Sequence, residues 1–90
     1  MNDSKYLLKH TVPEVAEYLT LRKACGLSLR GTAASKIGLS NSLFAVTVRR
    51  TSDQTLVGMG RLIGDRGTAY QILDIAVLPE DQGNGLAKSI

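Results

Sequence analysis

The sequence has one cysteine, one histidine and no tryptophan among its 90 residues. A disulfide framework needs pairs of cysteines, and a structural zinc site needs several Cys or His ligands, so we expect neither. The first residues, MNDSKYLLKHTVPEV, contain no apolar run of signal-peptide length. No stretch approaches the roughly 18 apolar residues of a membrane-spanning helix. These absences predict a cytoplasmic protein with no metal site and no membrane partner.

The composition is that of a globular chain, with 43% hydrophobic and 21% charged residues. Such a balance argues against wholesale disorder, and 90 residues form at most one small domain. The formal net charge is +3, but Lys and Arg are spread along the chain, with the tightest group at Arg49 and Arg50. Proteins that bind nucleic acid concentrate their basic residues on one face or helix. We therefore do not expect nucleic acid as a partner.

The first half of the chain predicts a strand followed by a helix. Residues 5–10 are short and apolar at their centre, which indicates a strand. Residues 11–26 predict a helix, because Thr11 and Glu14 have the spacing of a capping box and Gly26 is placed to end it.

One face of this helix is apolar, and it includes Tyr18 and Cys25. Cys25 has no basic partner nearby in the sequence, so a buried structural thiol is favoured over a nucleophile. The following segment, residues 27–41, is rich in small residues and predicts one short helix around residues 32–37.

The second half predicts strands at residues 42–50, 55–64 and 69–79, joined by the turn-like sequences TSDQ and DRGT. Three successive strands with tight turns form an antiparallel meander. Gly58 and Gly60 alternate within the middle strand, where they allow either a bulge or a helix packing against the sheet, or the close approach of a ligand. The expected fold class is mixed α/β (α+β): a strand, two helices, the meander and the start of a third helix.

The last residues, 79–90, read PEDQGNGLAKSI and form a glycine turn before a helix start. A buried strand runs up to Val77, and Pro79 ends it because proline cannot donate to the ladder. A turn of this kind presents several backbone N–H groups at the positive end of a helix dipole, where an anion of pyrophosphate size can bind. Many strand–helix joins use glycine only to make the corner, so the turn alone leaves both interpretations open.

The surrounding pattern adds to this reading. Residues 82–87, QGNGLA, resemble the acetyl-CoA loop of the GNAT superfamily of N-acetyltransferases, whose pattern is Gln or Arg, two residues, Gly, one residue, then Gly or Ala. The matching positions are Gln82, Gly85 and Ala87. The segments NSLFAVTV, LVGMGRLIGD and DIAVLPEDQGNG are similar to the family's second, third and fourth strands. VPEVAEYLTLRKACGLS stands where the family has its first helix and acceptor-site loop. The resemblance therefore spans the whole chain in the family's element order.

This resemblance implies an acetyl-CoA-dependent N-acetyltransferase that acts on a primary amine by direct attack and releases coenzyme A. The pantetheine arm would pair with the backbone of the fourth strand, and the pyrophosphate would lie on the N–H groups of the glycine turn. The implied cofactor-binding residues are Ile75, Ala76, Val77, Gln82, Gly83, Asn84, Gly85, Leu86, Ala87 and Lys88. Asn84 departs from the family, which often has Lys or Arg there, and this removes a charge but no backbone donor.

A general base is harder to assign. Asp74 is the first candidate and Asp65 the second, whereas Gln71 stands near a strand glutamate of some members but cannot take a proton. The alternative for Asp74 is a strand aspartate satisfied by hydrogen bonds or solvent. Arg61 is either a contact for an anionic acceptor or a solvated strand arginine, and Lys88 is either a phosphate contact or a surface lysine.

The resemblance further implies that residues 1–90 are the N-terminal part of a single domain whose C-terminal half is absent. The strand carrying residues 72–77 would then present an exposed edge, so we expect marginal stability or a homodimer through that edge. Two alternatives remain at this point. One is a catalytically inactive, truncated fragment or interaction remnant of the fold, and the other is an unrelated phosphate- or nucleic-acid-binding α/β module.

Overall fold

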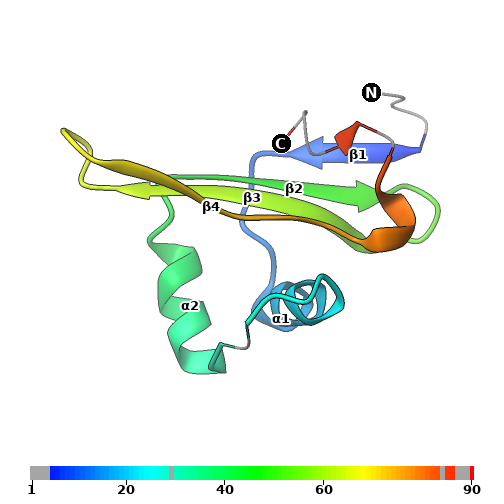
Figure 1. Ribbon diagram of the computed structural model, residues 1–90, viewed down its shortest axis with the longest axis horizontal. Coiled ribbons are helices and arrows are strands. Elements are labelled where there is room, and N and C mark those ends of the chain that lie inside the picture. Colours follow the sequence, from blue (N-terminus) through cyan, green and yellow to red (C-terminus); the bar gives the residue numbers. More distant parts are fainter. Residues whose placement is uncertain (1–4, 29, 84, 87–89) are drawn as a thin grey trace.

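The computed structural model describes residues 5–28, 30–83, 85–86 and 90. These residues form an antiparallel sheet of four strands in the order β1-β2-β3-β4, with two helices on one face (Figure 1). The elements are β1 Tyr6–Lys9, α1 Val15–Ala24, α2 Thr32–Ser40, β2 Phe44–Arg50, β3 Leu56–Gly64, β4 Tyr70–Val77 and a short 3-10 helix, η1, Pro79–Asp81. The expected mixed α/β order of a strand, two helices and a meander is confirmed, whereas most of the expected start of a third helix lies outside the described residues.

Helix α1 begins later than the sequence pattern predicts. Its N-cap is Glu14, and the Glu14 N–H donates to Glu17 Oε1 at 3.0 Å in a capping box three residues beyond the expected one. The expected box of Thr11 and Glu14 is therefore wrong. A helix starting after Thr11 would place Val12 in the helical region directly before Pro13, which is sterically disfavoured.

Two apolar clusters pack against the sheet, one on each face. The cluster under α1 and α2 consists of Tyr18, Leu21, Leu39, Leu56, Met59 and Ala76. The cluster on the opposite face consists of Tyr6, Val48, Val57, Val77 and Leu86. A fully buried side chain of this size contributes about 1.5–3 kcal/mol, so both faces of the sheet contribute to stability. None of the helices in the described ranges is long and apolar enough to cross a membrane.

Strand β4 carries a β-bulge next to the middle of β3. The register of the two strands shifts between Met59 and Arg61, so that Asp74 and Ile75 together face the single residue Gly60. Asp74 takes a φ of +57°, a left-handed conformation that is uncommon for a residue other than glycine. Its side chain is buried, whereas Ile75 is 45% exposed. The bulge therefore interrupts the simple alternation of faces along β4.

The two glycines within β3 make room for their neighbours. A Cβ atom on Gly60 would overlap the side chain of Ile90 and lie 2.6 Å from Ile75 Cδ1. A Cβ on Gly58 would lie 3.3 Å from Ile90 Cδ1. Of the interpretations left open by the sequence, the structure shows the bulge opposite Gly60, and the side chain of Ile90 packs against both glycines.

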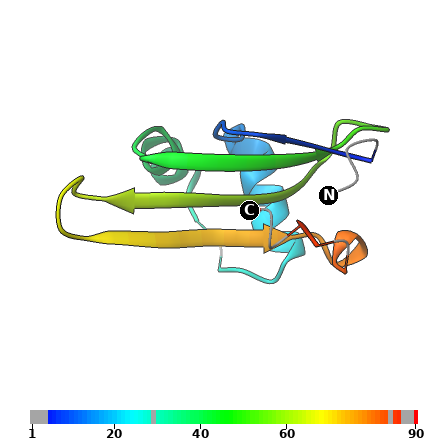
Figure 2. The ribbon, with the colours of Figure 1, turned by 90° about the horizontal axis from the view of Figure 1, so that it is seen from above.

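Strand β4 is one of the two edge strands of the described sheet, opposite β1 (Figure 2). It carries several exposed apolar side chains, among them Ile72, which is 70% exposed. The open edge expected from the sequence is thus present in the described part of the chain, beside the residues that lead into the glycine turn.

Gly64, at the end of β3, is a position where added volume should destabilise the fold. A Cβ there would overlap the carbonyl oxygen of Ala69 and lie 2.9 Å from Tyr70 Cδ1. The Ala69 carbonyl also accepts the Asp65 N–H at 3.1 Å, so it cannot move without breaking the hairpin. We expect Gly64→Ala to lower the free energy of unfolding by about 1–3 kcal/mol, measured by urea titration.

Gly67→Ala, in the same turn, is the matched control. The nearest atom to a Cβ on Gly67 is Asp65 Oδ1 at 3.7 Å, an ordinary contact. We expect this change to stay within about 0.5 kcal/mol. Equal losses in the free energy of unfolding for the two variants would show that the overlap at Gly64 adds no cost of its own.

Candidate functional site

An open groove of about 620 Å³ lies where β4 ends. Its lining residues are Ile75, Ala76, Val77, Gln82, Gly83, Gly85 and Leu86. Every one of them belongs to the cofactor-binding set that the sequence implies. The remaining members of that set, Asn84, Ala87 and Lys88, lie outside the described residues. The fold therefore brings the end of the strand and the glycine turn to one cavity.

The backbone of Val77 faces the open side of β4. The N–H of Leu78 donates to the Val57 carbonyl in β3 at 2.8 Å, and backbone groups alternate in direction along a strand, so those of Val77 point away from β3. The Val77 carbonyl accepts the Cys25 thiol at 3.3 Å and the Gln82 Nε2 at 3.0 Å. An extended ligand alongside β4 would therefore meet the Val77 N–H.

The glycine turn depends on backbone conformations that other residues rarely adopt. Gly83 has a φ of +89° and Gly85 a φ of +77°. Nothing lies within 4 Å of a Cβ built at either position, so backbone conformation rather than crowding within the chain explains these glycines. The Ile90 N–H donates to the Leu86 carbonyl, four residues earlier, at 3.0 Å. Backbone N–H groups beside left-handed residues can form a concave site suited to anions.

Asp74 lies in a buried cluster of charges beneath the sheet. The Arg61 Nε donates to Asp74 Oδ2 at 2.6 Å, the Tyr18 hydroxyl donates to the same oxygen at 2.9 Å, and Arg22 Nη1 donates to Oδ1. The side chains of both arginines are 6% exposed and that of Asp74 is 2% exposed. This cluster joins α1, β3 and β4 through a single carboxylate.

This environment gives Asp74 a structural role. Burial raises the pKa of its carboxyl, but the hydrogen bonds from Arg61 and Tyr18 and the charges of Arg61 and Arg22 outweigh it and lower the pKa from its ordinary value. A general base must gain a proton and reach its substrate, and this carboxylate is held ionised among buried donors. The contacts match the alternative of a strand aspartate satisfied by hydrogen bonds.

Arg61 differs from its sequence-based interpretation as a solvated strand arginine. It is 7% exposed, and its Nη1 donates to the Gly38 carbonyl in α2 at 3.0 Å. Arg22 was not singled out from the sequence at all. It follows Tyr18 by four residues and therefore lies on the same helix face. That spacing, together with the buried Tyr18, is the signal by which Arg22 could have been found.

Asp65, the second candidate base, is part of the β3–β4 turn. Its carboxylate accepts the N–H groups of Ala69, Gly67 and Thr68 at 2.8–3.1 Å. These hydrogen bonds, led by that of Ala69, hold the pKa of Asp65 well below its usual range. Gln71, in β4, is exposed and pairs with Ile63. The bonding of Asp65 accounts for its presence as a turn residue.

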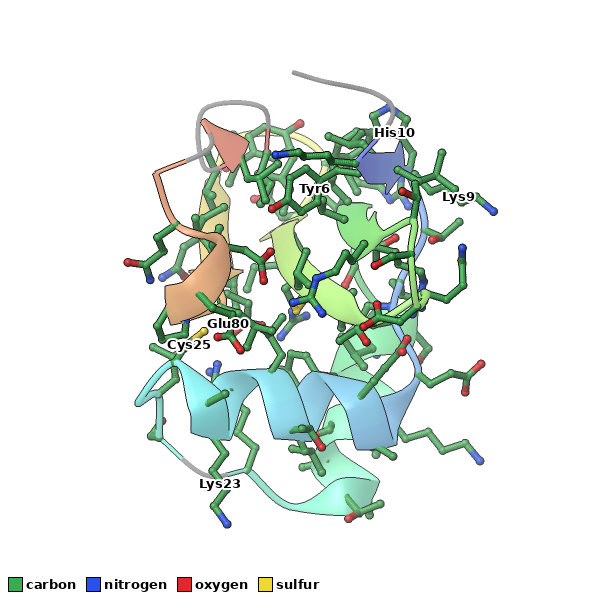
Figure 3. The ribbon with its side chains drawn as sticks, turned by 90° about the vertical axis from the view of Figure 1, so that its right-hand side faces the viewer. Tyr6, Lys9, His10, Lys23, Cys25 and Glu80 are labelled. Carbon is green, nitrogen blue, oxygen red and sulfur yellow. The ribbon has the colours of Figure 1, made fainter. Side chains whose placement is uncertain are left out.

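Cys25 lies at the C-terminal end of α1, close to η1, which carries Glu80 (Figure 3). Burial raises the pKa of its thiol, and the charge of Glu80 raises it further. The S–H group also donates to the Val77 carbonyl. A thiol with a raised pKa is a poor nucleophile, so these contacts support the structural interpretation.

Comparison with known proteins relates this arrangement to solved structures of acetyltransferases. No protein-family model matches the chain, and no curated protein matches it significantly. Among solved structures, a protein of unknown function from meticillin-resistant Staphylococcus aureus, described as a probable acetyltransferase, is 40% identical with a TM-score of 0.88 over 94% of this chain. A GNAT-family acetyltransferase from Streptococcus pneumoniae is 25% identical with a TM-score of 0.75 over 93% of this chain.

The chain covers 62% and 61% of the lengths of these two proteins. A GNAT-family N-acetyltransferase from Escherichia coli, solved in complex with CoA, is 14% identical with a TM-score of 0.68, and this likeness shows the fold alone. The element order, the groove and these neighbours agree. The resemblance to the GNAT superfamily of acetyltransferases is thus confirmed, and the chain has a partial GNAT fold.

Proposed function

We propose that this chain provides the acetyl-CoA-binding part of an N-acetyltransferase that acetylates a primary amine and releases coenzyme A. The observation that carries the proposal is the groove at the end of β4. All of its lining residues are among those that the resemblance to the GNAT superfamily implies for the cofactor. The structural likeness to acetyltransferases supports the same assignment.

The residues present fit such a cofactor. We assign the backbone of Ile75–Val77 to the pantetheine arm, because β4 is an edge strand of the described sheet and the Val77 N–H faces its open side. We assign the pyrophosphate to the turn that begins at Gly83, because Gly83 and Gly85 both have left-handed backbone conformations. Asn84, Ala87 and Lys88 belong to the same assignment on the sequence pattern alone.

Bound acetyl-CoA supplies a thioester whose carbonyl carbon an amine can attack. The Val77 N–H is the group that we assign to donate to the thioester oxygen, because a fixed donor there stabilises the charge that develops on it. The acceptor amine must be deprotonated before it attacks, since an ammonium has no lone pair. We propose neither Asp74 nor Asp65 as the base that accepts this proton, because hydrogen bonds within the fold already occupy both carboxylates.

The comparisons do not favour the alternatives of a non-catalytic remnant or an unrelated phosphate- or nucleic-acid-binding module. The likeness to acetyltransferases extends over 92–94% of this chain and not over the glycine turn alone. A phosphate-binding module of another class would share the turn without the order of strands and helices around it.

A thermal-shift titration of this chain with acetyl-CoA tests the proposal, with ATP as the control anion. A ligand that binds only the folded state stabilises it by about 2.7 kcal/mol at a hundredfold excess over its Kd. We expect a saturable rise in Tm with acetyl-CoA and none with ATP. No rise with acetyl-CoA, or an equal rise with both, would contradict a cofactor site built from strand and turn.

The same titration at two protein concentrations addresses the homodimer expected from the sequence. Two chains paired through the edge of β4 would use the backbone groups that we assign to the pantetheine arm. We therefore propose that self-association and cofactor binding compete, so that the apparent Kd for acetyl-CoA rises with protein concentration.

A further inference from the structure

Asp81, two residues before Gly83, connects the segment that leads into the glycine turn to strands β1 and β2. It is the last residue of η1 and is 4% exposed. The Tyr6 hydroxyl, on β1, donates to Asp81 Oδ1 at 2.8 Å. Arg50 Nη2, at the end of β2, donates to Asp81 Oδ2 at 2.8 Å. One carboxylate thus ties η1 to two strands that are remote from it in the sequence.

Two sets of contacts hold the residues at the start of the glycine turn. Gln82, the next residue, donates to the Val77 carbonyl at the end of β4. Asp81 is held from β1 and β2, whereas Gln82 is held from β4. In Figure 3, Tyr6 lies between β1 and the coil that leads to the turn. Leu86, beyond the turn, is 2% exposed in the cluster that contains Tyr6. Both ends of the turn are therefore attached to the sheet.

Arg50 partly compensates the negative charge of this network. A buried carboxylate two residues before Gly83 would by itself oppose a phosphate. Arg50 offsets that charge with a direct ion pair, and its Nη1 forms a second pair with Asp53 in the β2–β3 turn at 2.9 Å. The carboxylate can therefore hold the chain in place with its negative charge partly compensated, since Arg50 is shared between two carboxylates.

We propose that Asp81, held by Tyr6 and Arg50, is a positioning residue that presets the glycine turn for the phosphates of the cofactor. This inference rests on the proposed function, because it assumes that the turn takes a pyrophosphate. It assigns to Asp81 an effect on the phosphate end of the ligand only. Ile75–Val77, which we assign to the pantetheine arm, are attached to the sheet through the β3–β4 pairing instead.

Isothermal titration of the full chain with CoA and with pantetheine, which lacks the phosphates, separates the two ends of the ligand. For Asp81→Asn we expect the Kd for CoA to rise on the order of tenfold, because hydrogen bonds to a charged group are lost. The Kd for pantetheine should change less than about twofold, since its partners are on β4. A general loss of structure would weaken both ligands together.

Tyr6→Phe provides a second variant that removes one hydrogen bond and no charge. We expect it to weaken CoA about threefold, again without weakening pantetheine, and it decides the matter if Asp81→Asn does not fold. Asp53→Asn, which removes the other partner of Arg50, should leave both Kd values unchanged.

The outcomes distinguish the two proposals. Wild-type binding of CoA that is unaltered in both variants would overturn the positioning role and leave the proposed function standing. A wild-type chain that binds neither CoA nor pantetheine would overturn the proposed function itself. An equal rise in the Kd values for CoA and pantetheine in Tyr6→Phe would show that the network has only a structural role and would overturn the positioning role.

Discussion

Asp74→Ala should lower the free energy of unfolding by about 3–5 kcal/mol, because removing one partner of a buried ion pair leaves an uncompensated charge. Here two guanidinium groups, those of Arg22 and Arg61, would lose their shared carboxylate, and Tyr18 would lose its acceptor. A domain has only about 5–15 kcal/mol of stability in total, so the variant should lose most of its cooperative urea transition. Circular dichroism during urea titration measures this change.

The expected result separates a structural Asp74 from a catalytic one. Asp53→Ala is the matched control, because it also removes a carboxylate from an arginine, but in an exposed turn where the ion pair is screened. We expect its urea midpoint to stay near that of the wild type. A stable Asp74→Ala that binds acetyl-CoA but no longer transfers the acetyl group would restore the role of general base.

The pH dependence of stability gives a second readout of the same carboxylate. The folded-state pKa of Asp74 is lowered, so its contribution is present above its unfolded pKa, near 3.9, and is lost as the pH falls through the folded value. The stability of the wild type should therefore decline below about pH 4. Asp74→Asn, which cannot titrate, should lack this part of the decline, whereas an unchanged profile would mean that other carboxylates account for it.

Gly85→Val should weaken CoA binding on the order of tenfold, because the turn would lose the backbone conformation that we assign to hold the phosphates. Gly85 has a φ of +77°, and the left-handed region costs a residue with a Cβ roughly 1–2 kcal/mol. A β-branched side chain at the turn would also occupy space that we assign to the pyrophosphate. Isothermal titration with CoA measures the loss.

Gly31→Val is the control for this variant. Gly31 has a φ of −70°, which valine adopts without strain, and nothing lies within 4 Å of a Cβ there. We expect it to bind CoA like the wild type. Pantetheine binding to Gly85→Val should be retained, since its partners lie on β4. An unchanged affinity of Gly85→Val for CoA would place the phosphates elsewhere.

Local patterns predicted the features whose causes lie within a few residues of chain. The alternation of β-forming residues located β2, β3 and β4, and Gly26 marked the end of α1, where it has a φ of +74°. The spacing of Gln82 and Gly85 selected residues that line one groove. The predicted position of the capping box was wrong because Pro13 disfavours the helical conformation at the residue before it, so the helix begins later.

The sequence by itself determined the order of elements and the family resemblance, because helix ends, strands and glycine turns have causes within one or two turns of chain. Only the tertiary structure decided the partners of the buried charges. Asp74 meets Arg22 across 52 positions, and Tyr6 meets Asp81 across 75. A buried carboxylate must find donors wherever packing brings them, so its role depends on contacts that no local pattern specifies.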